Sequence, residues 1–100
     1  AELVPVQASH PSVVAYLRQK PDSAALVVAN LSEEALSVVT LSVAASFLPP
    51  GGELFATLLL RGGQARMLLD TDQNGGFTDY EPIEVLEPLG AYVIGLSAPD

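Results

Sequence analysis

AALVVANLSEEALSVVTLSV, residues 24–43, is the stretch that decides the fold. It contains two short apolar runs, residues 25–29 and 36–41, joined by a polar segment, residues 30–34. Both runs are short and rich in β-branched residues, which favours strands over helices. The first run has no polar face, so we expect it to be covered on both sides at the centre of a sheet. The second begins with the alternation of a half-exposed neighbour. Asn30 and Ser32 can bond to nearby backbone groups, as turn residues do, and the stretch therefore predicts a central β-hairpin.

Short apolar or alternating runs continue along the rest of the chain, with glycine and proline between them. Residues 13–19 alternate, with Val13, Ala15 and Leu17 on one face, and Pro5 fits an edge strand because an edge position can lack a backbone donor. Residues 43–48 fit either a helical turn or an extension of the preceding strand. Further strands are expected at residues 3–7, 53–60, 65–69, 83–86 and 91–96, with a hairpin turn at residues 61–63. The pattern predicts a single all-β domain over residues 1–100, an antiparallel two-sheet β-sandwich of about eight strands with Greek-key connections.

The composition narrows the class of partner. One hundred residues make one domain that buries roughly two-thirds of its unfolded surface. The formal net charge of −8 argues against nucleic acid and against an anionic membrane surface as partners, because both are bound through basic patches. The charge is compatible with a neutral polymer such as starch, or with cations. No apolar run reaches the roughly 20 residues of a membrane helix, and the absence of cysteine leaves the compartment open.

Residues 70–81, DTDQNGGFTDYE, satisfy the expression for a calcium-binding EF-hand loop. Oxygen ligands at alternate positions can surround a hard cation, and a glycine at the sixth position permits the sharp turn. An EF-hand also needs flanking helices, whereas the preceding residues read as a strand and Pro82 blocks a helix after the loop. The sequence therefore leaves two interpretations open, a calcium site and an acidic turn between strands. The candidate calcium ligands are Asp70, Asp72, Asn74, Gly76 and Glu81.

Carbohydrate sites commonly stack sugars on exposed aromatic rings. The chain has no tryptophan, three tyrosines and three phenylalanines. Tyr92 lies in an apolar strand and is expected in the core, whereas Tyr16 fits either the core or a domain interface. Phe77 and Tyr80, in the polar loop, are the pair expected to be exposed and are the candidate carbohydrate-binding residues.

Catalysis by this chain alone is not expected, so no catalytic residue is assigned. His10 is the only histidine and precedes a proline in a turn, there is no cysteine, and no serine lies in a G-x-S-x-G elbow. The carboxylate pairs Glu33 with Glu34 and Glu84 with Glu87 fall in turns or on opposite faces of strands.

Residues 16–18 (YLR), Asp22 and residues 25–32 (ALVVANLS), followed later by residues 86–93 (LEPLGAYV), resemble the C-terminal domain of the α-amylase superfamily of glycoside hydrolases. The resemblance spans roughly residues 10–96. In that family a β-sandwich follows the catalytic barrel, and the catalytic carboxylates lie in the barrel, which no part of this chain matches. The resemblance implies a non-catalytic accessory domain, cut from a larger enzyme, whose partner is the barrel of the same parent chain. The parent would be a glycosidase or transglycosylase acting on α-glucans.

Two functions from different classes follow. As an accessory domain, the chain would stabilise and pack on the barrel, and its excised face should carry an apolar patch, for which Leu3, Val4, Tyr16 and Leu48 are the candidates. The alternative is an independent module that binds glycans or calcium through residues 70–81, and the exposure of Phe77 and Tyr80 discriminates its glycan version. A third interpretation, an immunoglobulin-like or fibronectin-like adhesion module, lacks the Cys…Trp…Cys signature.

Overall fold

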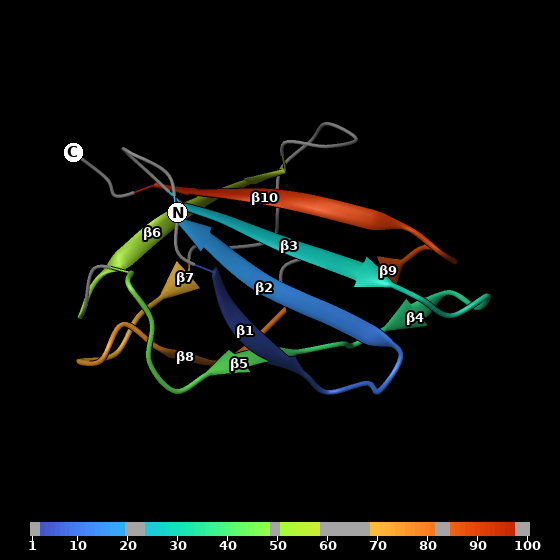
Figure 1. Cartoon of the computed structure of the whole chain (residues 1–100), viewed down its shortest axis with the longest axis horizontal. Coiled ribbons are helices and arrows are strands. Elements are labelled where there is room, and N and C mark those ends of the chain that lie inside the picture. Colours follow the sequence, from blue (N-terminus) through green and yellow to red (C-terminus); the bar gives the residue numbers. More distant parts are fainter. Residues whose placement is uncertain (1–2, 20–23, 49–50, 59–68, 82–84, 98–100) are drawn as a thin grey trace.

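The computed structural model describes residues 3–19, 24–48, 51–58, 69–81 and 85–97. Every regular element in these ranges is a strand, as Figure 1 shows. None of the described segments forms a helix long and apolar enough to cross a membrane. The strands are β1 (Leu3–Ala8), β2 (Val13–Gln19), β3 (Ala24–Asn30), β4 (Leu36–Ser37), β5 (Leu41–Val43), β6 (Glu53–Leu58), β7 (Leu69–Asp70), β8 (Phe77–Tyr80), β9 (Val85–Leu86) and β10 (Ala91–Ser97).

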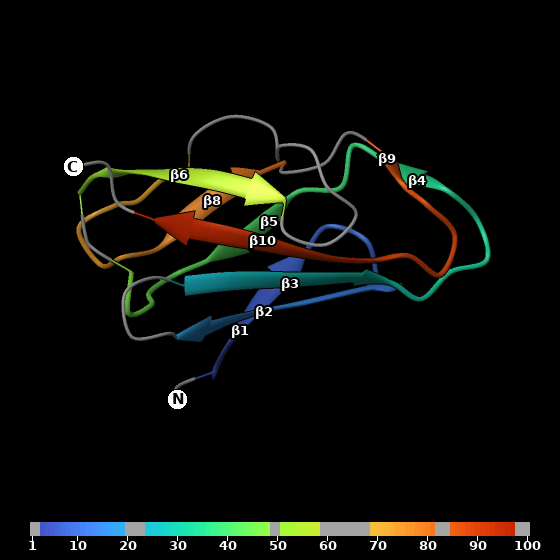
Figure 2. The same ribbon diagram turned by 90° about the horizontal axis from the view of Figure 1, so that it is seen from above.

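Eight of these strands form one antiparallel sheet in the order β7-β6-β10-β3-β2-β1-β5-β8, and β4 pairs with β9 in a small second sheet. The large sheet curls, so that its two edge strands, β7 and β8, come into contact and nearly close a barrel (Figures 1 and 2). The all-β, antiparallel class predicted from the sequence is confirmed. A division into two stacked sheets is not.

Strand β3 lies at the centre of the large sheet, as its uniformly apolar sequence predicted. It pairs along its whole length with β2, where Leu26 faces Leu17, and with β10, where Leu26 faces Ile94. All three of these side chains are fully buried. Because β2 and β10 occupy both edges of β3, no edge remains for the run that follows it in the chain.

The predicted pairing of residues 25–29 with residues 36–41 is therefore wrong. The second run is not one strand: it splits into β4, which pairs with β9, and β5, which pairs with β1 and β8. The break falls after β4 at Val38, whose backbone has a positive φ of 56°. That left-handed conformation is unusual for a β-branched residue and cannot continue a strand. The local turn was nevertheless predicted correctly, since the Oδ1 of Asn30 accepts the N–H of Ser32 over 2.9 Å.

The core lies inside the curled sheet. The predicted alternation of β2 is confirmed, with Val13, Ala15 and Leu17 buried, and Tyr92 is buried as expected. The other buried side chains of the core cluster come from most of the remaining strands and from the segments between them. They are Val6, Ala24, Leu26, Val28, Val39, Leu41, Leu48, Leu54, Leu69, Phe77, Tyr80, Leu86, Ile94 and Leu96.

The remaining predicted elements differ in how far the structure describes them. The expectation that residues 3–7 form an edge strand is wrong, because β1 lies between β2 and β5 in the sheet. Strand β5 pairs only with Gln7 and Ala8, however, so Pro5 lies where β1 pairs only with β2 and its missing N–H breaks no described pairing. Strand β6 pairs with β7, but the expected turn at residues 61–63 and most of the strand at 65–69 lie outside the described residues. The strand expected at 83–86 is described only as β9. After β5, residues 44–48 form neither a helical turn nor an extended strand.

Candidate functional site

The loop between β7 and β8 joins the two edge strands of the large sheet. At its centre the Oδ1 of Asp72 accepts hydrogen bonds from the backbone N–H of Asn74 (2.8 Å) and of Gly76 (3.0 Å). The N–H of Asp72 in turn donates to the carbonyl oxygen of Gly76 over 2.9 Å. An aspartate that bonds to nearby backbone groups in this way closes a turn on its own. The loop therefore holds its shape through protein groups.

The same loop is also fastened to the segments on either side of residues 49–50. The N–H of Gly51 donates to the carbonyl oxygen of Asp72 over 2.7 Å, and the N–H of Thr71 donates to the carbonyl oxygen of Gly52 over 2.8 Å. Ser46 donates both its N–H and its hydroxyl to carbonyl oxygens of the loop. Through these bonds the loop connects the edge strands β7 and β8 to the segments that flank residues 49–50.

The predicted calcium ligands are spread along the chain from β7 to the residue after β8 rather than around a central point. Asp70 lies on β7, where it faces Glu53 of β6, and Glu81 follows β8 directly. Asp72 and Gly76 use an oxygen each to accept backbone N–H groups. Across the described segments, no three acidic or histidine residues are grouped in a way that could hold a metal ion. Calcium binding stays a prediction, and strands rather than helices flank the loop.

Phe77 and Tyr80 are not the exposed aromatic pair that the sequence analysis expected. Both are buried, at 3% and 5% exposure, and their rings pack edge to face with centroids 5.9 Å apart. The polar residues around them misled the prediction, because β8 turns these two side chains toward the core while Thr78 and Asp79 face solvent. An open groove of about 470 Å³ beside β8 is lined by Phe77 but by no charged side chain and no exposed aromatic ring. The structure thus offers no stacking platform for a sugar at these residues.

Burial leaves the hydroxyl of Tyr80 without a hydrogen-bond partner among the described residues. Because the surroundings are apolar, burial raises the pKa of Tyr80 from 10.0 to about 12. The other buried tyrosine of the core, Tyr92, differs: the Oη of Tyr92 accepts the N–H of Glu87 over 2.8 Å. The two buried tyrosines therefore form a natural contrast between an unsatisfied and a satisfied hydroxyl.

Tyr80→Phe is expected to raise the free energy of unfolding by about 1 kcal/mol, since it removes a buried hydroxyl that lacks a partner. The matched change, Tyr92→Phe, is expected to lower it by about 1 kcal/mol, because it takes away the acceptor of the Glu87 N–H. Urea denaturation of both variants measures the two values. Equal losses in both variants would show that the Tyr80 hydroxyl has a partner in solution.

The raised pKa of Tyr80 also predicts the alkaline limit of stability. The unfolded chain releases the Tyr80 proton near its ordinary pKa of 10.0, whereas the folded protein holds it up to about 12. The unfolded state is therefore stabilised by ionisation between these values, and the contribution of Tyr80 to stability, complete below pH 10, is lost as pH rises toward 12. Denaturation of wild type and Tyr80→Phe across this range is expected to show the advantage of the variant growing with pH. A constant difference would contradict the shift.

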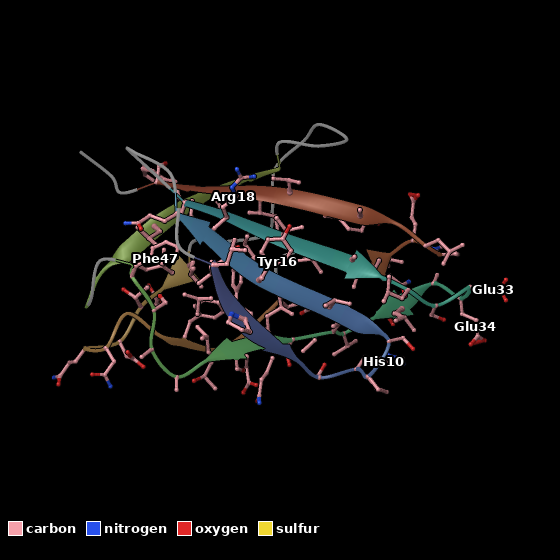
Figure 3. All side chains as sticks on the ribbon, in the orientation of Figure 1. His10, Tyr16, Arg18, Glu33, Glu34 and Phe47 are labelled. Atoms are coloured by element: carbon pink, nitrogen blue, oxygen red, sulfur yellow. The ribbon has the colours of Figure 1, made fainter. Side chains whose placement is uncertain are left out.

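The outward face of β1, β2, β3 and β10 carries several apolar side chains that are exposed or half-buried. Along one row of this face, Pro5, Tyr16, Val27 and Val93 lie beside one another on the four adjacent strands. Val14 and Leu3 continue the surface at 51% and 60% exposure, and Tyr16 is 38% exposed. Arg18 is the one charged residue at the outward positions described on these strands, and Figure 3 shows it beside Tyr16. We call this surface the outer face.

The predicted interface patch agrees with the outer face in part. Leu3 and Tyr16 belong to it. Val4 is half-buried and packs on the core, and Leu48 is buried at 3% exposure, so Leu48 was assigned wrongly. The prediction missed Pro5, Val14, Val27 and Val93, and the two valines of β2 and β3 were the clearest omission. Their signal was present, because β3 has no polar face and β2 adds a valine and a tyrosine to the same side.

The described residues that were considered for catalysis lie in three different turns. His10 uses its Nδ1 to accept the N–H of Ser12 over 3.0 Å. Glu33 and Glu34 are exposed in the turn after β3, at one end of the molecule (Figure 3). Glu84, one half of the second carboxylate pair, lies outside the described residues.

No family model, curated protein or solved structure matches the chain.

Proposed function

We propose that this chain is a non-catalytic accessory domain of an α-amylase-type glycoside hydrolase or transglycosylase, which packs its outer face on the catalytic barrel of the same parent chain and stabilises it. The observation that carries the proposal is the outer face itself: an apolar surface across four strands with one charge at its described outward positions, in a chain of net charge −8. Monomeric proteins seldom leave such patches uncovered, because burying apolar surface is worth roughly 25 cal/mol per Å².

The residues of the resemblance support the same surface. Tyr16 and Arg18, from one of the resembling segments, project from β2, and Val27, from the next segment, lies beside Tyr16 on β3. Interfaces between domains of one chain typically bury about 600–1,500 Å² and are more polar than the interfaces of obligate complexes, which is compatible with Arg18 at this surface. The two-sheet Greek-key sandwich of the resembled family is part of this proposal.

The parent chain provides the first test. We expect the coding sequence upstream of this domain to encode an α-amylase-type barrel, and an unrelated or missing upstream domain would contradict the proposal. In that parent enzyme, the double change Val14→Ser with Tyr16→Ser is expected to lower the melting temperature of the barrel. Val85→Ser, an equally exposed valine on β9 outside the outer face, serves as the control and is expected to leave it unchanged.

An assay of the chain by itself separates accessory from catalytic roles. The purified domain is expected to show no hydrolysis of a maltooligosaccharide. Measurable hydrolysis that survives repeated purification would overturn the non-catalytic assignment.

The alternative function is a binding module that acts through residues 70–81. Its glycan version loses its support because Phe77 and Tyr80 are buried. Its calcium version retains the spacing of the acidic residues. In the structure, however, Asp72 and Gly76 already bond to backbone groups, so calcium would have to displace those bonds.

A titration with calcium, followed by NMR chemical shifts of the labelled domain, tests this version. At millimolar calcium, the affinity range of extracellular sites, we expect no saturable shifts confined to residues 70–81. Magnesium serves as the control for a general effect of divalent charge. Saturable shifts with calcium and not with magnesium would establish the alternative.

A further inference from the structure

Asn74 and Gly75 form the one Asn-Gly pair of the chain. In such a pair the backbone nitrogen of the glycine, once it has lost its proton, attacks the carbonyl carbon of the asparagine side chain. A C–N bond forms, ammonia leaves and a cyclic succinimide results. Water then opens the ring at either carbonyl, which gives aspartate or isoaspartate, so the reaction needs no reagent besides solvent. Glycine favours the attack because no side chain shields its nitrogen.

The structure exposes the side chain of Asn74 but holds the backbone of Gly75. Asn74 is exposed, and its side-chain amide makes no hydrogen bond within the described part of the chain. Gly75 is buried, and its N–H donates to the carbonyl oxygen of Asp72 over 3.1 Å. The carbonyl oxygen of Asn74, in the same peptide group, accepts the N–H of Ser46 over 3.2 Å. The peptide group that has to rotate and lose its proton is therefore bonded at both ends.

The carboxylate of Asp72 closes the same turn. Its Oδ1 accepts the N–H groups of Asn74 and Gly76 over 2.8 and 3.0 Å. Hydrogen bonds to a charged acceptor contribute more to stability than those between neutral groups. The nitrogen of Gly75 must leave its acceptor before it can reach the side chain of Asn74, so the turn has to open first. The reaction then proceeds from the small fraction of molecules in which the loop is locally open.

Asn30, the other asparagine of the chain, has neither property that makes Asn74 reactive. It is 1% exposed, and its Nδ2 donates to backbone carbonyl oxygens, that of Glu34 among them. The residue after it is Leu31, whose side chain shields the nitrogen that would attack. Asn30 is therefore an internal reference for the reaction at Asn74.

An isoaspartate at position 74 does not fit the closed loop, because it adds one methylene group to the main chain. The backbone beside it has no space to take up the extra length: a Cβ on Gly75 would lie 2.6 Å from the carbonyl oxygens of Ser46 and Leu48. Aspartate, the other product, leaves the main chain unchanged and places its carboxylate at an exposed position.

We propose that the Asn74–Gly75 peptide is a site of spontaneous deamidation that the folded loop protects. The closed turn holds the reaction back, the open loop allows it, and the isoaspartyl product prevents the loop from closing again. A transient opening between β7 and β8 is thereby converted into a permanent loss of stability. This inference concerns the chemistry of the loop and does not rest on the proposed function.

The first test compares the folded protein with a synthetic peptide of residues 70–81 at mildly alkaline pH. Samples are taken over time, digested and analysed by mass spectrometry, which locates the deamidated residue. We expect Asn74 to react roughly tenfold or more slowly in the protein than in the peptide, and Asn30 to stay unmodified. Equal rates in protein and peptide would overturn the protection, and modification of Asn30 before Asn74 would overturn the assignment of the site.

Asp72→Ala tests the closing role of the carboxylate. It is expected to raise the rate at Asn74 in the folded protein roughly tenfold, because it removes two hydrogen bonds to a charged acceptor. Asp70→Ala removes the same charge from an exposed position on β7 and is expected to leave the rate unchanged. Circular dichroism checks that both variants are folded. Equal rates in the two variants would contradict the role of Asp72, and the comparison of wild type with the peptide depends on neither.

The last test concerns the product. The isoaspartyl form, separated from aged protein by chromatography, is expected to melt at least about 5 °C below fresh protein. Asn74→Asp reproduces the other product and is expected to melt close to wild type. An isoaspartyl form as stable as Asn74→Asp would show that the loop accommodates the longer main chain, and would overturn that part of the proposal.

Discussion

Replacing Asn30 with alanine is expected to lower the free energy of unfolding by about 3–4 kcal/mol. Asn30 is 1% exposed, and its Nδ2 donates to the carbonyl oxygens of Glu34 (2.9 Å), Glu87 (3.0 Å) and Leu86 (3.3 Å). Its Oδ1 accepts the N–H of Ser32. Alanine would leave these groups without their partner in the interior, where an unpaired polar group is most unfavourable.

Urea denaturation measures the loss, and Asn74→Ala is the matched control. Asn74 is exposed, and the bonds that hold its turn use its backbone N–H and carbonyl, so the same substitution there is expected to change stability by less than about 0.5 kcal/mol. Asn30→Asp sharpens the test, because a carboxylate cannot donate to the three carbonyl oxygens and should be at least as destabilising at neutral pH. Similar losses in Asn30→Ala and Asn74→Ala would contradict the role assigned to Asn30.

Gly76→Ala is expected to lower the free energy of unfolding by more than about 3 kcal/mol, or to prevent folding. A Cβ at this position would overlap the backbone carbonyl oxygens of Val43 and Ala44. Neither oxygen can move without shifting the end of β5, where the ladder with β8 already has an irregular register. At Gly75 a Cβ would lie 2.6 Å from the carbonyl oxygens of Ser46 and Leu48, and φ is +74°, so alanine is expected to be severely destabilising there as well.

Two other glycines supply the controls for this series. Gly52 has ordinary φ, and no described atom lies within 4 Å of the position that a Cβ would take, so Gly52→Ala is expected to be neutral within about 0.5 kcal/mol. Gly51 has the same free space but a φ of +65°, so Gly51→Ala isolates the strain of the left-handed backbone, about 1 kcal/mol. The expected loss of stability on substitution with alanine increases in the order Gly52, Gly51, Gly75 and Gly76. Thermal or urea denaturation of the four variants thus separates backbone strain from steric overlap. A Gly76→Ala protein as stable as Gly52→Ala would contradict the close approach.

The glycine series bears on the calcium pattern. In the EF-hand expression the glycine at position 75 permits the turn around an ion. Here the same glycine has a positive φ in a turn that the Asp72 carboxylate closes through hydrogen bonds of 2.8 and 3.0 Å. Aspartate and glycine at this spacing are therefore explained by turn chemistry and by the close contact with residues 43–48. That explanation is why we expect the calcium titration to show no saturable shifts.

The sequence could reveal the outer face only in part. The existence of an apolar outward face could be predicted. A strand that is apolar on both sides must have both sides covered within the domain, or it leaves one side for a partner. The choice of Leu48 for that face was wrong because an irregular segment has no period from which to read its orientation. The contact between the turn after β3 and the turn before β10 was not predicted. These turns are far apart in the chain, and the hydrogen bond from the N–H of Leu89 to the carbonyl oxygen of Ser32 joins them only in the folded protein.

The sequence by itself determined the features that depend on neighbouring residues. These are the all-β class, the alternation of β2, the central place of β3 and the turn at Asn30, because side-chain period and turn chemistry act over a few residues. Only the tertiary structure decided which strands pair, since β10 competes successfully with residues 36–41 for the free edge of β3. It also decided that Phe77 and Tyr80 face inward. Strand pairing and burial depend on contacts between distant segments, and a short polar strand can place its aromatic residues on either side until the rest of the sheet has formed.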